Sequence, residues 1–399
     1  MYSKLASIEF TNQWDCPDAS HTERVYVPNV NFWRAYFPVG IDKGWEDLEI
    51  GASLSHQFEA GELVVPWSEK KIYRAYDSQI TTEWSNGEKI VFAPGRYFSN
   101  GLLPKLGFPP DDRGLFRVIS HENRKLIFDF NAPLAKYPLK LTGKISKIAR
   151  DKTERGGQAQ DIMQTMTSNG FGMQARLDQV ATEFYADNPF QTENEEDDRL
   201  FYESTRFVDY VDSEASDNIS EIYNRFLDSG MKVLDLMSGC ASHLPEDRPT
   251  IELTGLGLND EELNKNAALH HRKIHDLNQN PIIPFEDQQF DLVICSLSIE
   301  YLTQPKEIFK DIARILKPGA HLIITFSDRW LAQKVTRIWE MLYAFERMGL
   351  VTDFFKSTGR FENLSTESVQ GYYRPYNDPL YREKRESDPI FAVWGQLKA

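Results

Sequence analysis

The chain has 399 residues, 41% of them hydrophobic and 26% charged, the composition of an ordinary globular protein of two or three domains. Its net charge of −15 argues against a broad phosphate-binding surface, so we expect no nucleic-acid partner. No apolar run approaches the ~20 residues that span a bilayer, and the first residues lack a secretory apolar core, so we expect a cytoplasmic protein with no membrane partner.

Residues 1–150 are rich in aromatic residues, prolines and glycines and show no long helical periodicity. Apolar residues alternate along Leu126–Phe130 and Leu139–Ile145, which is typical of strands. Turn pairs such as Asn86-Gly87 and Pro94-Gly95 separate other segments. We therefore predict a β-rich domain of short strands.

One part of this region has a more specific pattern. The run Asp129-Phe-Asn-Ala-Pro-Leu-Ala135, followed by a strand pattern over Leu139–Ile148, resembles the closing strands of FKBP-type prolyl isomerases. It is most similar to their bacterial chaperone-like branch, where the pattern is D-F-N-H-P-L-A-G. The resemblance implies a small FKBP-like domain of the α+β class, which could hold a peptide, shield the second domain or make homodimers. Ala132 replaces the histidine and Lys136 the glycine of that pattern, which argues against isomerase activity.

Residues 151–198 are expected to connect two domains, since they begin with a polar stretch around Gly156-Gly157 and end in a charge run typical of a solvated loop. The next segment places Tyr202 and Arg206 one turn apart if it is helical. Arginine has forked donors that suit a ligand carboxylate, so we consider both residues candidates for ligand binding. Arg206 could equally be a surface arginine.

An apolar run over Val233–Leu236 predicts a buried parallel strand that carries Asp235. A turn of small residues follows and includes Ser238, Gly239 and Cys240. In open α/β sheets, a strand that leads a carboxylate into such a turn holds nucleotide-like ligands, because small side chains let the backbone approach the ligand. An ordinary strand-to-helix turn is the alternative interpretation.

The next two apolar strands end in polar side chains. The strand over Ile251–Asn259 ends where dinucleotide-type sheets bond the ribose hydroxyls, although Asn259 with Glu262 also fits a helix N-cap. The third strand ends near Asp276, whose carboxylate could accept a bond from an adenine amino group while Leu277 offers its backbone N–H. These residues are further candidates for binding a nucleotide-like ligand.

A fourth buried strand is predicted over Phe290–Leu297, with Ser296, Glu300 and Tyr301 at or beyond its C-terminal end. A fifth strand over His321–Phe326 and two more near the end of the chain alternate with amphipathic helices. Alternation of this length implies right-handed parallel crossovers and a doubly wound α/β sheet.

In order and spacing, these elements look like a class I S-adenosylmethionine-dependent methyltransferase over residues 199–399. The matching segments are Val233–Leu236, Asn259, Asp276–Asn278, Phe290–Cys295 and Ile315–Gly319. The resemblance implies a mostly parallel, seven-stranded Rossmann-like sheet with S-adenosylmethionine as cofactor. Met237 and Ala241 stand where the family has glycines, and only Gly239 of the glycine turn remains, a departure that bears on cofactor affinity more than on the fold.

The resemblance also implies roles for individual residues. The turn after the first strand would hold the methionine part, Asn259 the ribose, and Asp276 with Leu277 the adenine, while Ser296 would line the cleft beneath the sulfonium. The implied cofactor-binding set is Tyr202, Arg206, Asp235, Ser238, Gly239, Cys240, Asn259, Asp276, Leu277 and Ser296.

Methyl transfer from a sulfonium requires alignment and exclusion of water, and a general base only when the acceptor is protonated. His243 is the first candidate base because its pKa lies in the useful range, although it could instead fix the loop that follows it. Glu300 and Tyr301 are second candidates. We expect no metal site, because His271 and His275 are four residues apart but lack a third ligand.

We therefore predict a methyltransferase (EC 2.1.1.-) that acts on a small-molecule or peptide acceptor. Residues 1–150 would guide or shield the acceptor, residues 151–198 would connect, and residues 199–399 would transfer the methyl group. The alternative is a prolyl isomerase or chaperone-like binding protein whose methyltransferase fold is inactive. Intact Asp235 and Gly239 favour the first hypothesis, and the loss of the other glycines favours the second.

Overall fold

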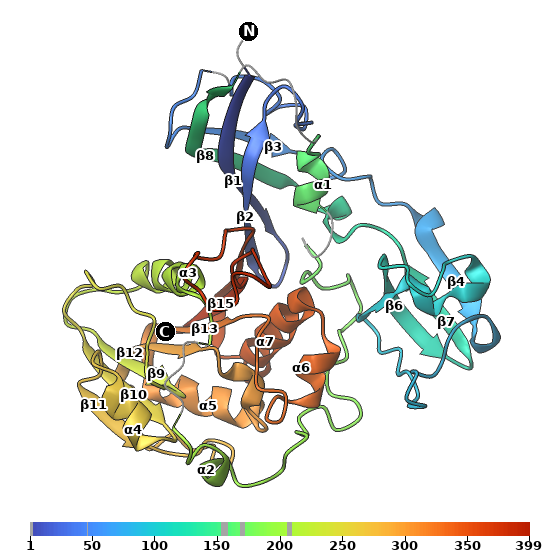
Figure 1. Cartoon of the computed structure of the whole chain (residues 1–399). Helices are drawn as coiled ribbons and strands as arrows, with labels where there is room; N and C mark the ends of the chain where they lie inside the picture. Colours follow the sequence, from blue (N-terminus) through green and yellow to red (C-terminus); the bar gives the residue numbers. More distant parts are fainter. Residues whose placement is uncertain (1–2, 46, 153–158, 168–171, 206–209) are drawn as a thin grey trace.

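The computed structural model describes residues 3–45, 47–152, 159–167, 172–205 and 210–399 (Figure 1). Within these residues the chain forms two β-sheets. An 11-stranded mixed sheet has the order β11-β10-β9-β12-β13-β15-β14-β2-β1-β8-β3, and a 4-stranded sheet has the order β4-β7-β6-β5. The helices of the described ranges are too short or too polar to cross a membrane.

The C-terminal part of the large sheet is the mostly parallel α/β sheet that the sequence predicts. β9 pairs in parallel with β10 and β12, β10 with β11, and β12 with β13, while β15 lies antiparallel between β13 and β14. Its strands are β9 (Lys232–Leu236), β10 (Glu252–Gly257), β11 (His271–Ile274), β12 (Phe290–Ser296), β13 (Leu316–Phe326), β14 (Phe361–Gln370) and β15 (Ile390–Leu397). The helices around it are α3 (Ser213–Asn224), α4 (Asp260–Lys265), α5 (Pro305–Ile315), α6 (Arg337–Met341) and α7 (Ala344–Thr358).

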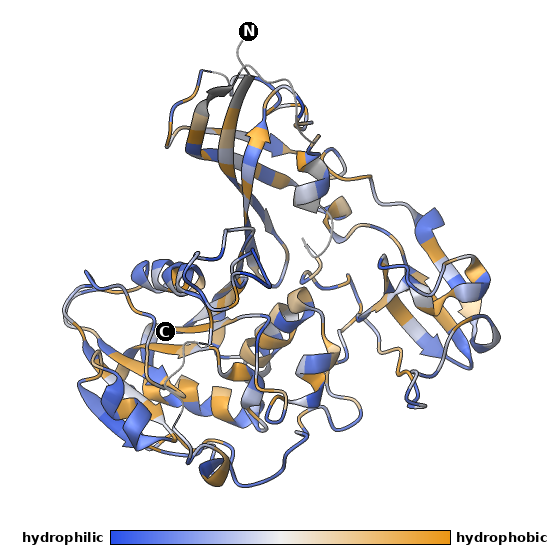
Figure 2. Cartoon of the chain, viewed as in Figure 1, coloured by the Kyte–Doolittle hydropathy of each residue, from blue (hydrophilic) through white to orange (hydrophobic). Residues whose placement is uncertain are grey.

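Alternate residues of the buried strands face opposite hydrophobic cores. In β12, Leu292 and Ile294 belong to the cluster that includes α3, whereas Val293 and Cys295 belong to the cluster that includes α5 and α7. Figure 2 shows hydrophobic residues along the central strands and on α5, and mainly hydrophilic residues on β11 and α4. Since helices cover both faces of this sheet, the carboxyl ends of its strands are the edge at which a ligand can bind.

The N-terminal strands extend the same sheet. β1 pairs antiparallel with β2 and β8, and β8 pairs antiparallel with β3. β2 pairs in parallel with β14, from Ser20 opposite Ser365 to Val25 opposite Gln370. The strands are β1 (Ser3–Asp15), β2 (Ser20–Asn31), β3 (Ser53–Phe58) and β8 (Leu139–Lys152). Backbone hydrogen bonds therefore join the two halves of the chain, which the sequence did not predict.

The 4-stranded antiparallel sheet is formed by the chain between β3 and β8 and has its own hydrophobic core around Phe116 and Phe128. Its strands are β4 (Ile72–Tyr76), β5 (Tyr97–Ser99), β6 (Leu115–Glu122) and β7 (Lys125–Asp129). The strands predicted at Leu126–Phe130 and Leu139–Ile145 are confirmed as β7 and β8; β7 is shifted by one residue, and β8 runs on to Lys152. The FKBP-like character of this region stays a prediction.

The predicted domain limits, 1–150, 151–198 and 199–399, also stay a prediction. The structure adds that the first range contains two hydrophobic cores, one under β1, β2 and β8 and one in the 4-stranded sheet. The helix α1 (Ile162–Thr167) lies in the predicted connector, and α2 (Asp198–Phe201) begins at its last residue. Short 3-10 helices are η1 (Glu69–Lys71), η2 (Asp77–Gln79), η3 (Asn100–Leu102), η4 (Pro104–Leu106), η5 (Pro133–Lys136) and η6 (Ile299–Tyr301).

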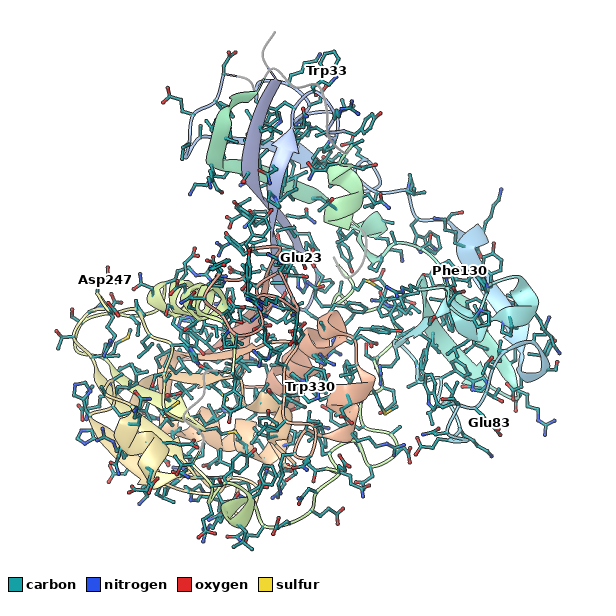
Figure 3. The ribbon with its side chains drawn as sticks, viewed as in Figure 1. Glu23, Trp33, Glu83, Phe130, Asp247 and Trp330 are labelled. Atoms are coloured by element: carbon teal, nitrogen blue, oxygen red, sulfur yellow. The ribbon has the colours of Figure 1, made fainter. Side chains whose placement is uncertain are left out.

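Charged side chains are buried where β2 meets β14. The guanidinium of Arg24 lies 3.0 Å from the Glu9 carboxylate and 3.3 Å from the Glu367 carboxylate. Glu23 on the same strand lies at this junction (Figure 3), accepts a hydrogen bond from the backbone N–H of Gly172 over 3.0 Å, and has a pKa that burial raises. Because separating a buried charge from its partner is costly, the pair of Arg24 on β2 with Glu367 on β14 favours the observed register of these two strands.

We expect Gly371→Ala to destabilise this junction by about 1–3 kcal/mol more than Gly359→Ala does. Both glycines have positive φ, +85° at Gly371 and +65° at Gly359, so an alanine strains the backbone at either site. At Gly371 a Cβ would also lie 2.3 Å from the carbonyl oxygen of Tyr26 on β2, whereas at Gly359 it would meet no atom within 4 Å. Urea unfolding of the two variants measures the difference, and equal losses would contradict a tight β2–β14 contact.

Candidate functional site

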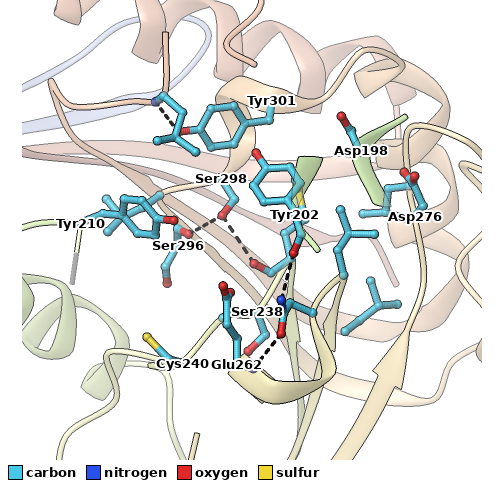
Figure 4. Close-up of a pocket in the computed structure, with 18 of the residues that line it drawn as sticks. Asp198, Tyr202, Tyr210, Ser238, Cys240, Glu262, Asp276, Ser296, Ser298 and Tyr301 are labelled. Atoms are coloured by element: carbon cyan, nitrogen blue, oxygen red, sulfur yellow. Dashed lines mark hydrogen bonds between the residues drawn. The ribbon is translucent and has the colours of Figure 1, made fainter. Parts of the chain in front are cut away.

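A pocket lies at the carboxyl ends of β9, β10 and β12, with a volume of about 1040 Å³ including its open mouth (Figure 4). Parallel strands end at the same edge of a sheet, so residues far apart in sequence meet there. The candidates from the sequence that line it are Tyr202, Ser238, Gly239, Cys240, His243, Asn259, Asp276, Leu277, Ser296 and Tyr301. Arg206 lies outside the described residues.

Asp235 does not line this pocket but lies beneath the turn that follows β9. Its buried carboxylate accepts hydrogen bonds from the hydroxyls of Ser238 over 2.6 Å and Ser242 over 2.7 Å. The amide of Asn266 donates to the carbonyl of Gly239 and to the hydroxyl of Ser242. Burial raises the pKa of Asp235 to about 6, and the two serine hydroxyls oppose that shift. Asp235 therefore shapes the turn from below.

The turn brings bare backbone to the pocket. A Cβ added at Gly239 would meet one side-chain atom within 4 Å, a carboxylate oxygen of Glu262 at 3.6 Å. On the other side of the turn, a Cβ at Gly257 would lie 2.3 Å from the carbonyl oxygen of Ser238, so β10 and the turn pack backbone against backbone. Met237 has φ +58°, a conformation that costs a non-glycine residue about 1–3 kcal/mol and that concentrates at functional sites.

Asn259 is the N-cap of α4, as one of the two sequence interpretations predicts. Its side-chain oxygen accepts from the backbone N–H of Glu262 over 3.0 Å, and its amide donates to the carbonyl of Tyr202 over 2.9 Å. The side chain is thus engaged by the helix on one side and by the segment after α2 on the other. Its predicted ribose contact stays a prediction.

Asp276 and Asn278 shape the wall beyond β11. The buried carboxylate of Asp276 accepts from the backbone N–H groups of Asn278 over 2.9 Å and Gln279 over 3.2 Å. The amide of Asn278 donates to the Asp198 carboxylate over 2.8 Å and to the carbonyl of Tyr301 over 2.9 Å. Asn278 therefore joins α2 to η6 across one end of the pocket.

Ser296 lies at the end of β12 on a buried chain of hydroxyls. The phenol of Tyr223 lies 2.7 Å from the Ser296 hydroxyl and 2.8 Å from that of Thr325. Ser298, which also lines the pocket, donates to the carbonyl of Ser296 over 2.9 Å. Leu297 between them has φ +53°, so this strand end, like that of β9, leaves the sheet through a left-handed residue.

Two of the three candidate catalytic residues line the pocket, and the third does not. His243 lines the pocket, and its Nδ1 lies 2.9 Å from the Ser216 hydroxyl. Tyr301 lines it too, its hydroxyl accepts from the backbone N–H of Leu331 over 2.8 Å, and burial raises its pKa. Glu300 does not line the pocket: it is 1% exposed, and burial raises its pKa to about 8. The strand-end position of Glu300 suggested a pocket residue, but η6 turns its side chain into the core.

The aromatic segment between β14 and β15 is absent from the pocket lining. Tyr372 stacks on Tyr26 of β2 with ring centroids 4.7 Å apart, and Arg374 is fully buried among carboxylates. The pocket has further lining residues that the sequence did not single out as binding residues, and these include Asp198, Tyr210, Leu258, Glu262, His275, Asn278 and Leu331. Among them, Glu262 left a sequence signal through its place three residues after the N-cap, and Asn278 through its place in the Asp276–Asn278 segment.

The acidic side chains in the described lining of the pocket outnumber the lysines and arginines. Within the described residues, its lining includes the carboxyl groups of Asp198, Glu262 and Asp276 and no lysine or arginine. Three phenol rings, those of Tyr202, Tyr210 and Tyr301, add faces that attract cations. Asp198 pairs with the Lys334 ammonium at 2.8 Å, so the carboxyl groups of Glu262 and Asp276 are the part of the described lining that favours a ligand with positive charge and with hydroxyl or amino groups that donate hydrogen bonds.

Comparison with known proteins agrees with this arrangement. Residues 237–324 match the family model of a methyltransferase domain. The chain is 26% identical over 182 residues to the ubiquinone/menaquinone biosynthesis C-methyltransferase UbiE of Laribacter hongkongensis, covering 41% of this chain and 73% of that protein. It is 30% identical over 110 residues to the ubiquinone biosynthesis O-methyltransferase of Proteus mirabilis, covering 25% of this chain and 43% of that protein.

Other similar proteins match over part of their length. Phosphoethanolamine N-methyltransferase 2 of Caenorhabditis elegans is 22% identical over 223 residues, and the chain covers 50% of it. Among solved structures, the Haemonchus contortus phosphoethanolamine N-methyltransferase 2 in complex with S-adenosyl-L-methionine has a TM-score of 0.32 and 16% identity, over 45% of this chain and 52% of that one. The chain thus spans between about a fifth and three quarters of the curated relatives it matches.

Proposed function

We propose that this chain, which carries a class I S-adenosylmethionine-dependent methyltransferase domain, transfers a methyl group from S-adenosylmethionine to a small-molecule or peptide acceptor. The observation that carries the proposal is the pocket at the ends of β9, β10 and β12, which gathers the turn after β9, Asp276 and Ser296. When bound, the cofactor would supply an electrophilic methyl group on a positively charged sulfur.

The residues present fit such a cofactor. The bare backbone at Gly239 leaves room where a side chain would stand, and the carboxyl groups of the lining favour a cation. In this proposal Ser238, Gly239 and Cys240 hold the methionine part, with Asp235 fixing their turn. Asp276 and the backbone N–H of Leu277 hold the adenine.

The acceptor would be aligned and kept from water by the remaining lining. Tyr301 is held in place by its hydrogen bond from Leu331, and its raised pKa suits a hydroxyl that donates to the acceptor rather than one that removes a proton. His243 is the base that this proposal assigns to a protonated acceptor. The Ser216 hydroxyl, 2.9 Å from Nδ1, would orient its ring in the pocket.

The N-terminal half would guide or shield the acceptor, and a second function is favoured by one observation there. A pocket of about 1360 Å³ with its open mouth lies beside the 4-stranded sheet, and its lining includes Val64, Tyr97, Phe130 and Pro133 as well as the charged residues Lys71, Arg113 and Asp129. The Tyr97 hydroxyl is buried without a hydrogen-bond partner among the described residues. A pocket that combines apolar and polar side chains with such a hydroxyl suits a peptide, so a chaperone-like or prolyl-isomerase-like binding protein is the second candidate.

The proposal also includes the cellular compartment in which the protein acts. The three cysteines, Cys16, Cys240 and Cys295, are not joined in disulfide bonds, as suits a reducing compartment such as the cytoplasm.

We expect Gly239→Val to weaken binding of S-adenosylhomocysteine by about 10- to 100-fold, because overpacking a filled site costs ~1–3 kcal/mol. The free protein should keep its stability, since the space beside Gly239 is open. Titration calorimetry measures the binding, and urea unfolding of the same variant controls for the fold. Wild-type protein that does not bind S-adenosylhomocysteine or S-adenosylmethionine would overturn the methyltransferase proposal, whereas peptide binding that persists in Gly239→Val would support the second candidate.

A further inference from the structure

The end of β10 lacks a side chain where open α/β sheets bind a ribose. β10 ends at Gly257, and a Cβ there would lie 2.3 Å from the Ser238 carbonyl oxygen, which leaves no room for a larger residue. Asn259, two residues on, already accepts from the Glu262 backbone N–H and donates to the Tyr202 carbonyl. A ribose in this pocket would therefore need a different partner.

Glu262 is placed to be that partner. It lies in the first turn of α4, lines the pocket, and has a carboxylate oxygen 3.6 Å from the position that a Cβ at Gly239 would take. Figure 4 shows its carboxylate pointing from the helix toward the centre of the pocket, between Cys240 and Tyr202. The sequence pattern suggested that this side chain turns back to the Asn259 backbone as a capping box, yet the cap of α4 consists of the Asn259 side chain and the Glu262 N–H.

The other two carboxyl groups in the described lining, those of Asp276 and Asp198, lie in another part of the pocket. Asp276 accepts from two backbone N–H groups, and Asp198 pairs with the Lys334 ammonium at 2.8 Å and with the Asn278 amide. Both lie on the far side of Tyr202 from Cys240 (Figure 4). Among the three carboxyl groups in the described lining of the pocket, Glu262 is thus the one beside the turn after β9.

We propose that the Glu262 carboxylate accepts hydrogen bonds from the vicinal 2′- and 3′-hydroxyls of an adenosyl ligand. The inference rests on the proposed function and goes beyond it by assigning the diol to a helix residue instead of the strand end. A carboxylate offers two acceptor oxygens and no donor, which matches a pair of hydroxyls, and bonds to a charged acceptor are about twice as strong as neutral ones.

Titration calorimetry with S-adenosylhomocysteine and its 2′-deoxy analogue tests the assignment. We expect Glu262→Ala to bind S-adenosylhomocysteine about 10- to 100-fold more weakly than wild type, and Glu262→Gln to lie between them. The 2′-deoxy analogue should bind wild type about 10-fold more weakly than the parent, and the two ligands should bind Glu262→Ala within about 3-fold of each other. Asp260→Asn is the matched control, because Asp260 is an exposed acid in the same helical turn and does not line the pocket.

The outcomes separate this inference from the proposed function. Wild type that binds the parent ligand, with the same 2′-deoxy penalty in wild type and Glu262→Ala, overturns the role of Glu262 and leaves the methyltransferase proposal standing. Wild type that binds neither ligand overturns both. Equal weakening in Asp260→Asn and Glu262→Gln would trace the effect to the charge of the helix terminus and would also overturn the assignment.

Discussion

Replacing Arg374 with methionine is expected to lower the free energy of unfolding by about 3–5 kcal/mol, because it leaves buried carboxylates without their cation. The Arg374 guanidinium is fully buried and lies 3.4 Å from the Asp212 carboxylate and 3.0 Å from that of Asp378. It also pairs with Asp388, whose side chain is fully buried and whose pKa is lowered chiefly by Arg374, against the effect of burial.

A matched control is available at Arg329. Its guanidinium pairs with the same Asp388 carboxylate at 3.2 Å, but its side chain is 39% exposed. Exposed pairs contribute about 0–1 kcal/mol, so we expect Arg329→Met to cost at most about 1 kcal/mol. Urea unfolding of both variants measures the contrast, and Asp388→Asn in the Arg374→Met background should recover part of the loss. Similar losses at the two arginines would contradict a buried ion cluster.

This cluster bears on the site because of the elements it joins. Asp212 is the N-cap of α3, and its carboxylate also accepts from the backbone N–H of Asp388 over 2.7 Å. Tyr210, two residues earlier, lines the pocket. The segment between β14 and β15 thus supports the start of α3 behind the pocket, and its residues are absent from the pocket lining.

Replacing Glu300 with glutamine should make the protein more stable than wild type at high pH, by roughly 3–5 kcal/mol. Glu300 is buried, and burial raises its pKa from 4.5 to about 8, with Arg347 opposing the shift. One of its carboxyl oxygens has no hydrogen-bond partner among the described residues. Ionised Glu300 is therefore disfavoured in the folded chain, and glutamine removes that cost.

The sign of the pH dependence follows from the raised pKa. Below pH 4.5 the carboxyl group is protonated in both the folded and unfolded chain, so Glu300 and glutamine should differ little. As the pH rises from 4.5 to about 8, the unfolded chain ionises first and wild type loses stability relative to Glu300→Gln. Above about pH 8 the difference should stay constant.

Unfolding of the two proteins in urea between about pH 4 and pH 9 measures this difference, and Glu340→Gln is the matched control for removing a carboxyl group at an exposed position. A flat difference for Glu300→Gln would contradict the raised pKa. The same variant informs the mechanism, because Glu300 lies outside the pocket lining. Methyl transfer at neutral pH should therefore survive in Glu300→Gln, once an acceptor is known.

Local sequence patterns were sufficient to locate several strands of the C-terminal half. Buried strands are apolar runs of fixed length, and the small residues after Val233–Leu236 can form only a tight turn, so β9, β10 and β12 could be located from the sequence. Parallel strands end at one edge of a sheet, which is why Ser238, Asp276 and Ser296 were expected to meet and do line one pocket.

The direction in which individual side chains point could not be predicted from local sequence patterns. Asp235 and Glu300 occupy strand-end positions like those of their neighbours, yet both carboxyl groups are buried away from the pocket. Asp235 lies in β9, whose pleat directs its side chain beneath the turn, and Glu300 lies in the 3-10 helix η6, which directs its side chain into the core. Whether a side chain at a strand end faces the pocket depends on the backbone angles of the next one or two residues. Met237 and Leu297 follow the ends of β9 and β12 and have positive φ, a conformation that cannot be predicted from an apolar side chain.

The sequence by itself thus determined the α/β character of the C-terminal half, the succession of β9, β10, β12 and β13 along the chain and the position of the turn after β9, because period and turn chemistry are encoded within a few residues. Only the tertiary structure decided that β14 pairs with β2, that the chain between β3 and β8 forms a second sheet, and that Glu262 enters the pocket. These features depend on which edges and faces are left to pair after the local elements form. Partners such as Ser20 and Ser365 are joined by contacts across the whole chain, which no local pattern records.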